Sequence, residues 1–414
     1  MKLSGKFGLG LWLTGALALS ALGAEESTNR VASFKDFDAR ARAGKTMEVV
    51  YLGGVLTWGA NATDPETTSY RGLMNGYLRK KYFSANFKFH DAATDVGGSR
   101  LGLFRFERDV LAVHPDLVFL EFTFDDNPDG TDRPGLASYE RLLFELVREG
   151  VPVVQVLIGS KSHFGPGWNP FGYQRLRDHL ELGRLYRTAI GNSFPIINEV
   201  VQGSAILRDR IWPEGETFPS DEGHRLIFQA AQAGLDKAIV DGRICRRPDR
   251  PVFGEMYANR IQIFPAELPL PRGWTAEASF RSEGGDSIST HWNRRVAVCD
   301  AANTNAQPLT VSFTGSFFGL LGESDEKGMA YTVRVDGKPI PFREMRSGSV
   351  MEWPTTSSRT GGGRRFFWHD VSDKLQDQPH VMTLSPVFDG ATAGGQLRVE
   401  SICIAGGDLR ARPF

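Results

Sequence analysis

The fold of this chain is decided by a stretch near its beginning, Met47-Glu48-Val49-Val50-Tyr51-Leu52-Gly53-Gly54-Val55-Leu56-Thr57-Trp58-Gly59. The stretch contains a short, continuously apolar run, which is typical of a strand that is buried on both faces. The Gly-Gly pair predicts a tight turn, because glycine adopts backbone conformations that other residues avoid. The residues after the pair predict the start of a helix. The stretch therefore predicts a buried strand, a sharp turn and a helix in direct succession.

The rest of the first half repeats this alternation. Apolar runs predict strands over 49–52, 117–122, 151–158 and 195–201. Helical spacing of apolar residues predicts helices over 70–78, 136–146, 174–190 and 222–240. Parallel strands that alternate with helices form a three-layer α/β domain, and its site lies beyond the carboxyl ends of the strands.

The pattern changes after residue 258. The segment 259–271 is rich in proline and predicts an extended linker. Short β runs follow over 295–299, 310–313, 331–335, 381–384 and 397–404. Asp336-Gly337 predicts a hairpin turn, and 355–365 predicts a mobile loop. We therefore expect an α/β domain over 25–258 and an all-β sandwich, jelly-roll-like, over 272–414.

Composition and the first residues suggest an exported globular protein. The chain has 414 residues, 41% of them hydrophobic, and a formal net charge of −1, which gives no reason to expect nucleic acid as a partner. Residues 1–24 have a Lys-containing start, an apolar run and small residues before a cleavage point, as a signal peptide has. We expect a secreted or periplasmic protein without a stable membrane span after cleavage. An uncleaved anchor is the alternative.

The three cysteines are Cys245, Cys299 and Cys403. An odd number leaves at least one thiol free or paired between chains. Cys299 and Cys403 lie in apolar runs, where buried thiols and a bridge are both compatible with the sequence. None has the spacing of metal ligands, and we expect no cofactor.

Four blocks, in order, resemble the SGNH (GDSL-type) hydrolases over roughly residues 45 to 240. Gly53-Gly54-Val55-Leu56-Thr57 stands where the family has Gly-Gly-Ser-Ile-Thr, and 92–102 contains a Gly-rich turn with Gly97-Gly98. The third block, 115–126, ends in Asp125-Asp126 in place of Asn-Asp. The fourth, 212–224, contains Phe218-Pro219 and Gly223-His224 where the family has Asp-x-x-His-Pro and Gly-His. The resemblance implies a flavodoxin-like three-layer α/β/α domain. The C-terminal part is similar to the β-sandwich attached to some carbohydrate esterases of this family.

The four catalytic positions of the family are all changed. Val55 replaces the serine nucleophile, Phe218 the histidine base, and Gly215 the aspartate that orients the base. Asp125 replaces the asparagine that donates to the oxyanion, and an ionised carboxylate can only accept hydrogen bonds. At ~4 Å two like charges repel by about 4 kcal/mol in a moderately polar site. The sequence therefore predicts that Ser-His-Asp esterase chemistry is lost and favours a pseudoenzyme.

The remaining candidates for a pocket are defined by the same blocks. They are Gly54, Trp58, Gly97, Gly98, Phe124, Asp126, Glu214, Glu216 and His224. The apolar replacements Val55 and Phe218 either pack the old site shut or form a platform on which a sugar ring stacks. The carboxylates either serve acid/base chemistry on glycosidic bonds, hold a cation or form a solvated rim. We expect His224 to be structural.

These features predict a secreted protein that binds a glycan or a protein partner without hydrolysing an ester. An extracytoplasmic polysaccharide is the expected partner. One alternative is an active carbohydrate (acetyl) esterase that uses displaced residues, and another is a carboxylate-based glycan-active enzyme. In the sandwich, an aromatic group is either a sugar-binding surface or part of the core or domain contact: Trp353, Phe366, Phe367, Trp368 and His369.

Overall fold

The structure is a computed structural model. It describes residues 30–413 except 95, 127–129, 165–171, 281–294, 344–349, 352–364 and 408. The predicted signal peptide, Trp353 and all but the last residue of the loop predicted over 355–365 lie outside the described residues.

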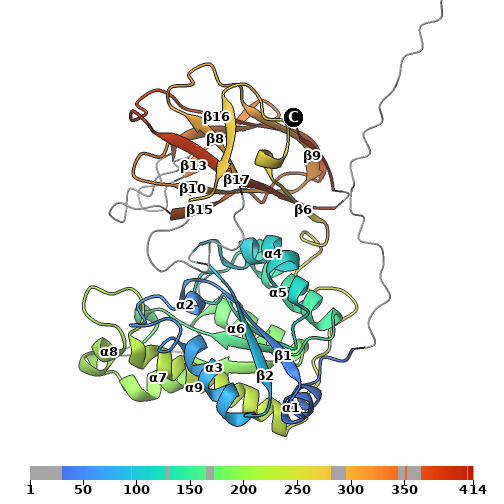
Figure 1. The fold of residues 1–414 in the computed structure, drawn as a ribbon, viewed down its shortest axis with the longest axis vertical. Coiled ribbons are helices and arrows are strands. Elements are labelled where there is room, and N and C mark those ends of the chain that lie inside the picture. The colour runs from blue at the N-terminus through green and yellow to red at the C-terminus, as the bar shows by residue number, and fades with distance from the viewer. Residues whose placement is uncertain are drawn as a thin grey trace, which may run out of the picture.

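The first domain is built on a parallel five-stranded sheet with the order β2-β1-β3-β4-β5 (Figure 1). Its strands are β1 (Thr46–Gly53), β2 (Asn86–Ala93), β3 (Leu117–Glu121), β4 (Val153–Leu157) and β5 (Ala189–Asn192). Every residue of β3 and β4 is buried, as the continuous apolar runs predict. The strand order is that of flavodoxin-like sheets, so the expected fold class is confirmed for this domain.

Two groups of helices enclose this sheet. The helices are α1 (Phe34–Arg42), α2 (Val55–Trp58), α3 (Tyr70–Lys81), α4 (Gly98–Asp109), α5 (Arg133–Arg148), α6 (Gln174–Leu185), α7 (Ser193–Val201), α8 (Ala205–Ile211) and α9 (Asp221–Val240). Helix α9 packs on α1 and α3, whereas α5 packs on α4 and α6. No helix of the described residues is long and apolar enough to cross a membrane.

The strand predicted over 195–201 is wrong, because these residues belong to α7. Asn192 caps that helix by accepting from the Phe194 N–H at 3.1 Å, and Pro195 lies in its first turn, where a missing N–H costs nothing. The true strand, β5, occupies the end of the helix predicted over 174–190, which stops at Leu185.

The second domain is a sandwich of two antiparallel sheets. One has the order β15-β10-β17-β8-β7 with β6 also paired to β17, and the other has the order β12-β11-β16-β9-β18. The strands are β6 (Arg260–Ile263), β7 (Trp274–Ala278), β8 (Arg295–Asp300), β9 (Leu309–Gly315), β10 (Phe317–Ser324), β11 (Tyr331–Val335), β12 (Lys338–Ile340), β15 (Arg365–Ser372), β16 (Gln378–Pro386), β17 (Gln396–Ala405) and β18 (Arg410–Pro413), beside a small pair β13 (Phe342–Arg343) and β14 (Val350–Met351). The expected all-β sandwich is confirmed.

Two details of this domain refine the sequence predictions. The hairpin at Asp336-Gly337 joins β11 to β12, and both turn residues have positive φ, 53° and 74°. Strand β6 lies within the segment 259–271, so part of the predicted linker belongs to the sheet of the second domain. Cys245, Cys299 and Cys403 are all buried and free.

The two domains share an apolar contact. Phe317, at the start of β10, belongs to the same buried cluster as the α/β core, and its ring stacks on Phe104 of α4 at a centroid distance of 5.7 Å. Arg100 of α4 pairs with Asp370 at 2.6 Å and Asp373 at 3.2 Å, both from the second domain. Helix α4 is therefore the main element through which the sandwich meets the first domain.

Candidate functional site

The turn after β1 has the shape that the sequence predicts. Gly54 caps α2, which begins at Val55, and neither glycine before Val55 has room for a side chain. A Cβ on Gly53 would lie 2.1 Å from the Thr57 hydroxyl oxygen, and one on Gly54 would lie 1.7 Å from the Asp125 carboxylate. The turn therefore places residue 55 at the carboxyl end of the sheet, with a side chain that is 8% exposed and chemically inert.

The carboxylate of Asp125 lies directly against this turn. Its Oδ1 accepts from the Val55 N–H at 3.5 Å, and its Oδ2 occupies the space beside Gly54. The backbone N–H of the first helical residue is a natural donor for an oxyanion at this position. In this chain that donor faces a carboxylate instead.

A second carboxylate, which the sequence analysis did not single out, lies beneath the turn. Glu121, the last residue of β3, is fully buried. It accepts from the Thr57 hydroxyl at 3.2 Å and from the Phe124 N–H at 3.3 Å. Burial, and then the nearby Asp125 charge, hold the pKa of Glu121 well above its usual value, which favours the neutral acid. Its only sequence signal is a charged residue inside an apolar strand.

Asp126 is turned toward the second Gly-rich turn. Its Oδ1 accepts from the Ser99 N–H at 2.8 Å, at the beginning of α4. Burial raises the pKa of Asp126 to about 6 although this hydrogen bond opposes the shift. Asp126 therefore anchors the first turn of α4.

The Gly97-Gly98 turn also meets the second domain. Both residues have positive φ, 90° and 50°, which explains why glycine is needed. A Cβ on Gly97 would lie 3.1 Å from the indole of Trp368, and one on Gly98 would lie 2.4 Å from Asp126. Trp368 packs on Phe104 at a centroid distance of 6.1 Å, so this residue of the predicted aromatic group lies at the domain contact.

The loop before α9 supplies one residue to the neighbourhood of this turn. The ring of Phe218 packs on Phe124 at a centroid distance of 5.9 Å, and its carbonyl accepts from Asn61. Glu214, Gly215 and Glu216 are exposed. The structure brings Phe218 and Phe124 together and leaves the two glutamates in solvent.

Trp58 and His224 differ in how their polar atoms are used. The Nε1 of Trp58 is buried and has no hydrogen-bond partner among the described residues. His224 is fully buried: its Nδ1 accepts from the Tyr70 N–H at 3.4 Å, and its Nε2 donates to the Ala60 carbonyl at 3.0 Å. Burial lowers the pKa of His224, which keeps it neutral. Both ring nitrogens are engaged, so His224 holds α9 to α3 and is not available as a base.

The hydroxyls of Thr57 and Ser99, which follow the two Gly-Gly turns, are also engaged in hydrogen bonds. Thr57 is fully buried and bonds both Tyr70, at 2.8 Å, and Glu121. Ser99 is fully buried and bonds Ser138 at 2.7 Å. The described residues contain no cluster of His, Cys, Asp and Glu that could hold a metal ion.

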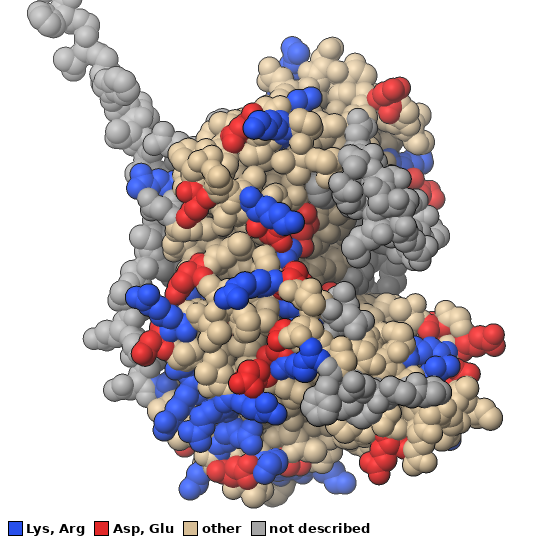
Figure 2. Space-filling model, turned by 180° about the vertical axis from the view of Figure 1, so that it is seen from behind, with Lys and Arg blue, Asp and Glu red and all other residues tan. Residues whose placement is uncertain are grey.

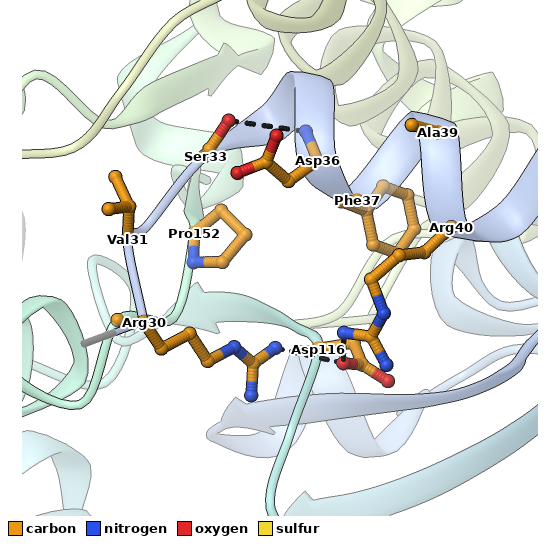
Figure 3. A pocket seen from close by; sticks show the side chains of 10 residues that line it. Arg30, Val31, Ser33, Asp36, Phe37, Ala39, Arg40, Asp116 and Pro152 are labelled. Carbon is orange, nitrogen blue, oxygen red and sulfur yellow. Dashed lines mark hydrogen bonds and ion pairs between the residues drawn. The ribbon is translucent and has the colours of Figure 1, made fainter. Parts of the chain in front are cut away.

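A pocket of about 500 Å³ lies at the opposite end of the sheet (Figure 3). Figure 3 shows the guanidinium groups of Arg30 and Arg40 converging on Asp116, which precedes β3. Asp36 lines the same pocket, so two cations face two carboxylates. Because sites of this fold lie beyond the carboxyl ends of the strands, this pocket is separate from the candidate site.

Comparison with known proteins supports the same architecture. No protein-family model and no curated protein matches the chain. Among solved structures, a two-domain esterase active on acetylated mannans, co-crystallised with mannopentaose, matches with a TM-score of 0.67 at 17% identity, over 92% of this chain and 98% of that one. Another crystal structure of a two-domain esterase active on acetylated mannans matches with a TM-score of 0.66 at 18% identity, over 91% of this chain and 95% of that one. The chain has the two-domain fold of these carbohydrate esterases.

Proposed function

We propose that this protein binds an extracytoplasmic polysaccharide and does not hydrolyse esters by Ser-His-Asp chemistry. The observation that carries the proposal is the Asp125 carboxylate, which lies against Gly54 and the Val55 N–H. When this carboxylate is ionised, it repels the oxyanion of acyl transfer. Val55 supplies no nucleophile, and the nearby Thr57 and Ser99 hydroxyls are buried and bonded.

The ligand class is suggested by the fold and by the aromatic residues. The two similar structures are described as esterases active on acetylated mannans, and one was crystallised with mannopentaose. Phe124 and Phe218 form a partly exposed aromatic pair. Aromatic faces and a few directed polar groups suit a sugar ring. We therefore propose that this protein is secreted and that its ligand is mannan or a related polysaccharide of hexose units.

The test combines binding and turnover on one protein preparation. Isothermal titration with mannopentaose should show binding that Phe218→Ala weakens about fivefold, since one stacking contact is worth about 1 kcal/mol. Phe83→Ala is the matched control, because Phe83 is an exposed aromatic residue outside the site. Turnover of p-nitrophenyl acetate or acetylated mannan that one site substitution abolishes would refute the non-catalytic proposal. Glycan binding that survives both Phe218→Ala and Asp125→Ala would exclude this site.

A carboxylate-based enzyme is the second candidate, and it is favoured by the raised pKa of Asp126, which is about 6. A carboxyl group with a pKa near 6 is protonated in mildly acidic solution, where it can act as a general acid. Release of reducing ends from mannan, lost in Asp126→Asn and Asp125→Asn, would support it. Unchanged chain length after long incubation would exclude it.

A further inference from the structure

The end of the α/β domain opposite the candidate site carries two protruding apolar side chains. Phe83, two residues after α3, is 91% exposed, and Val240, the last residue of α9, is 85% exposed. The two lie at the same end, because α3 packs on α9 and Lys81 near the end of α3 pairs with Asp236, one turn before Val240. This end of the domain therefore presents apolar side chains to the solvent in addition to its charged groups.

Helix α1 completes this end of the domain. The Tyr82 hydroxyl donates to Asp38 at 2.6 Å, which ties α1 to the end of α3. In the turn after α1, a Cβ on Gly44 would lie 3.1 Å from the Ser84 carbonyl oxygen. The ends of α1 and α3 therefore form one continuous surface with Phe83 between them.

Cations surround these apolar groups. We call the surface the basic tip, and define it by Phe83, Val240, Lys35, Arg42, Lys45, Arg79, Lys80, Lys81 and Lys237. Its seven cations face three carboxylates, Asp38, Asp236 and Asp241, which pair with Arg42, Lys81 and Lys237. These groups give the basic tip a formal net charge of +4, whereas the whole chain has a formal net charge of −1.

Four of the seven cations of the basic tip are uncompensated. Lys35, Lys45, Arg79 and Lys80 are exposed, and none forms an ion pair with another described residue. Figure 2, which views the molecule from behind, shows Lys and Arg side chains together with some Asp and Glu side chains at the lower end of the α/β domain. The pocket on the other side of α1 adds no net charge, because Arg30 and Arg40 face Asp36 and Asp116.

We propose that the basic tip attaches the protein peripherally to an anionic lipid surface. Exposed lysines are attracted to anionic headgroups, and an aromatic ring flanked by such lysines inserts at the boundary between headgroups and acyl chains. A soluble polyanion would use the cations and leave Phe83 and Val240 in water, which is why the lipid surface fits better. Attachment through this end leaves the carboxyl ends of the strands, and with them the candidate site, facing away from the lipid.

The test is co-sedimentation of the full chain with vesicles of phosphatidylcholine containing about one third phosphatidylglycerol. We expect binding to these vesicles to exceed binding to pure phosphatidylcholine. Lys45→Gln/Lys80→Gln should lower the partition coefficient about 25-fold, which is about fivefold for each lysine. Phe83→Ser should lower it about tenfold. Every variant keeps the rest of the chain, so residues 1–29 contribute equally to all.

Matched controls lie outside the basic tip. Lys327→Gln/Lys338→Gln removes two exposed lysines of the sandwich, and Ile206→Ser replaces an apolar residue of α8 that is 77% exposed. Both should bind vesicles like the parent. Equal binding by all variants, or no preference for anionic vesicles, would overturn the proposal. A lysine variant that loses heparin and vesicles alike, with Phe83→Ser unchanged on both, would instead assign the tip to a soluble polyanion.

Discussion

Asp125 should suppress esterase activity even after the missing triad is rebuilt. The triple variant Val55→Ser/Gly215→Asp/Phe218→His restores nucleophile, orienting carboxylate and base at the family positions. An oxyanion bound at the residue-55 N–H would lie roughly 4 Å from the Asp125 carboxylate, which already accepts from that N–H at 3.5 Å. Repulsion at that distance is about 4 kcal/mol, or about a thousandfold in rate.

Adding Asp125→Asn to the triple variant should therefore raise kcat/KM for p-nitrophenyl acetate by about a thousandfold. Asparagine replaces the repelling charge with a donor, so the gain should appear mainly in kcat. Gly215→Asp is sterically possible because, apart from the adjacent residues, no atom of the described residues lies within 4 Å of a Cβ there, although its φ of 81° strains a residue with a side chain. Thermal melting of both variants controls for folding. Equal activity of the triple and quadruple variants would refute the role assigned to Asp125.

Three further outcomes follow from buried groups. Burial raises the pKa of Glu400, at the domain contact, to about 7. The free energy of unfolding should therefore fall by on the order of 3 kcal/mol as the pH rises from about 4.5, the pKa of this group in the unfolded chain, to about 7. Urea unfolding of Glu400→Gln should show a free energy of unfolding that depends less on pH over this range. Trp368→Ala should lower the free energy of unfolding by about 2 kcal/mol, since it empties space over Gly97 and Phe104, whereas truncating the exposed Phe83 should change it by less than about 0.5 kcal/mol. All three cysteines are buried and free, and burial raises the pKa of Cys245 to about 11. A thiol reagent should therefore label no cysteine in the native protein and three cysteines in denaturant. Labelling of fewer than three cysteines in denaturant would reveal a disulfide bond.

The central strands could be predicted from sequence because β1, β3 and β4 are buried on both faces and leave continuous apolar runs. Edge strands are harder to predict from the sequence, because they leave shorter or less continuous apolar runs. Strand β2 lies at the edge and is only partly buried, so its pattern is an alternation around Phe87 and Phe89 that carries less signal. Strand β5 has only four residues and follows α6 after a short turn, so the helical pattern hides it.

The candidate site was predictable where one residue decides the chemistry. Val55 cannot be a nucleophile in any fold, and Asp125 cannot donate a hydrogen bond while it is ionised. Glu121 and Trp368 were not identified as residues at this site, because their importance depends on what lies next to them in space. Glu121 matters here because it accepts a hydrogen bond from the Thr57 hydroxyl. Trp368 matters because it packs close to Gly97, more than 250 residues earlier in the chain.

The contact between Trp368 and Gly97 has a consequence for how this protein can change. A Cβ at position 97 would lie 2.5 Å from the Leu101 side chain, which is a clash within the first domain, and 3.1 Å from the indole, which is a tight contact, and its backbone φ of 90° is unfavourable for a residue with a side chain. The glycine of the turn is therefore required by the packing of Leu101 in α4 and by the close fit of Trp368, whether or not the turn binds an oxyanion. The shape of this turn is thus fixed by packing within the α/β domain and against the sandwich, independently of the chemistry at residue 55.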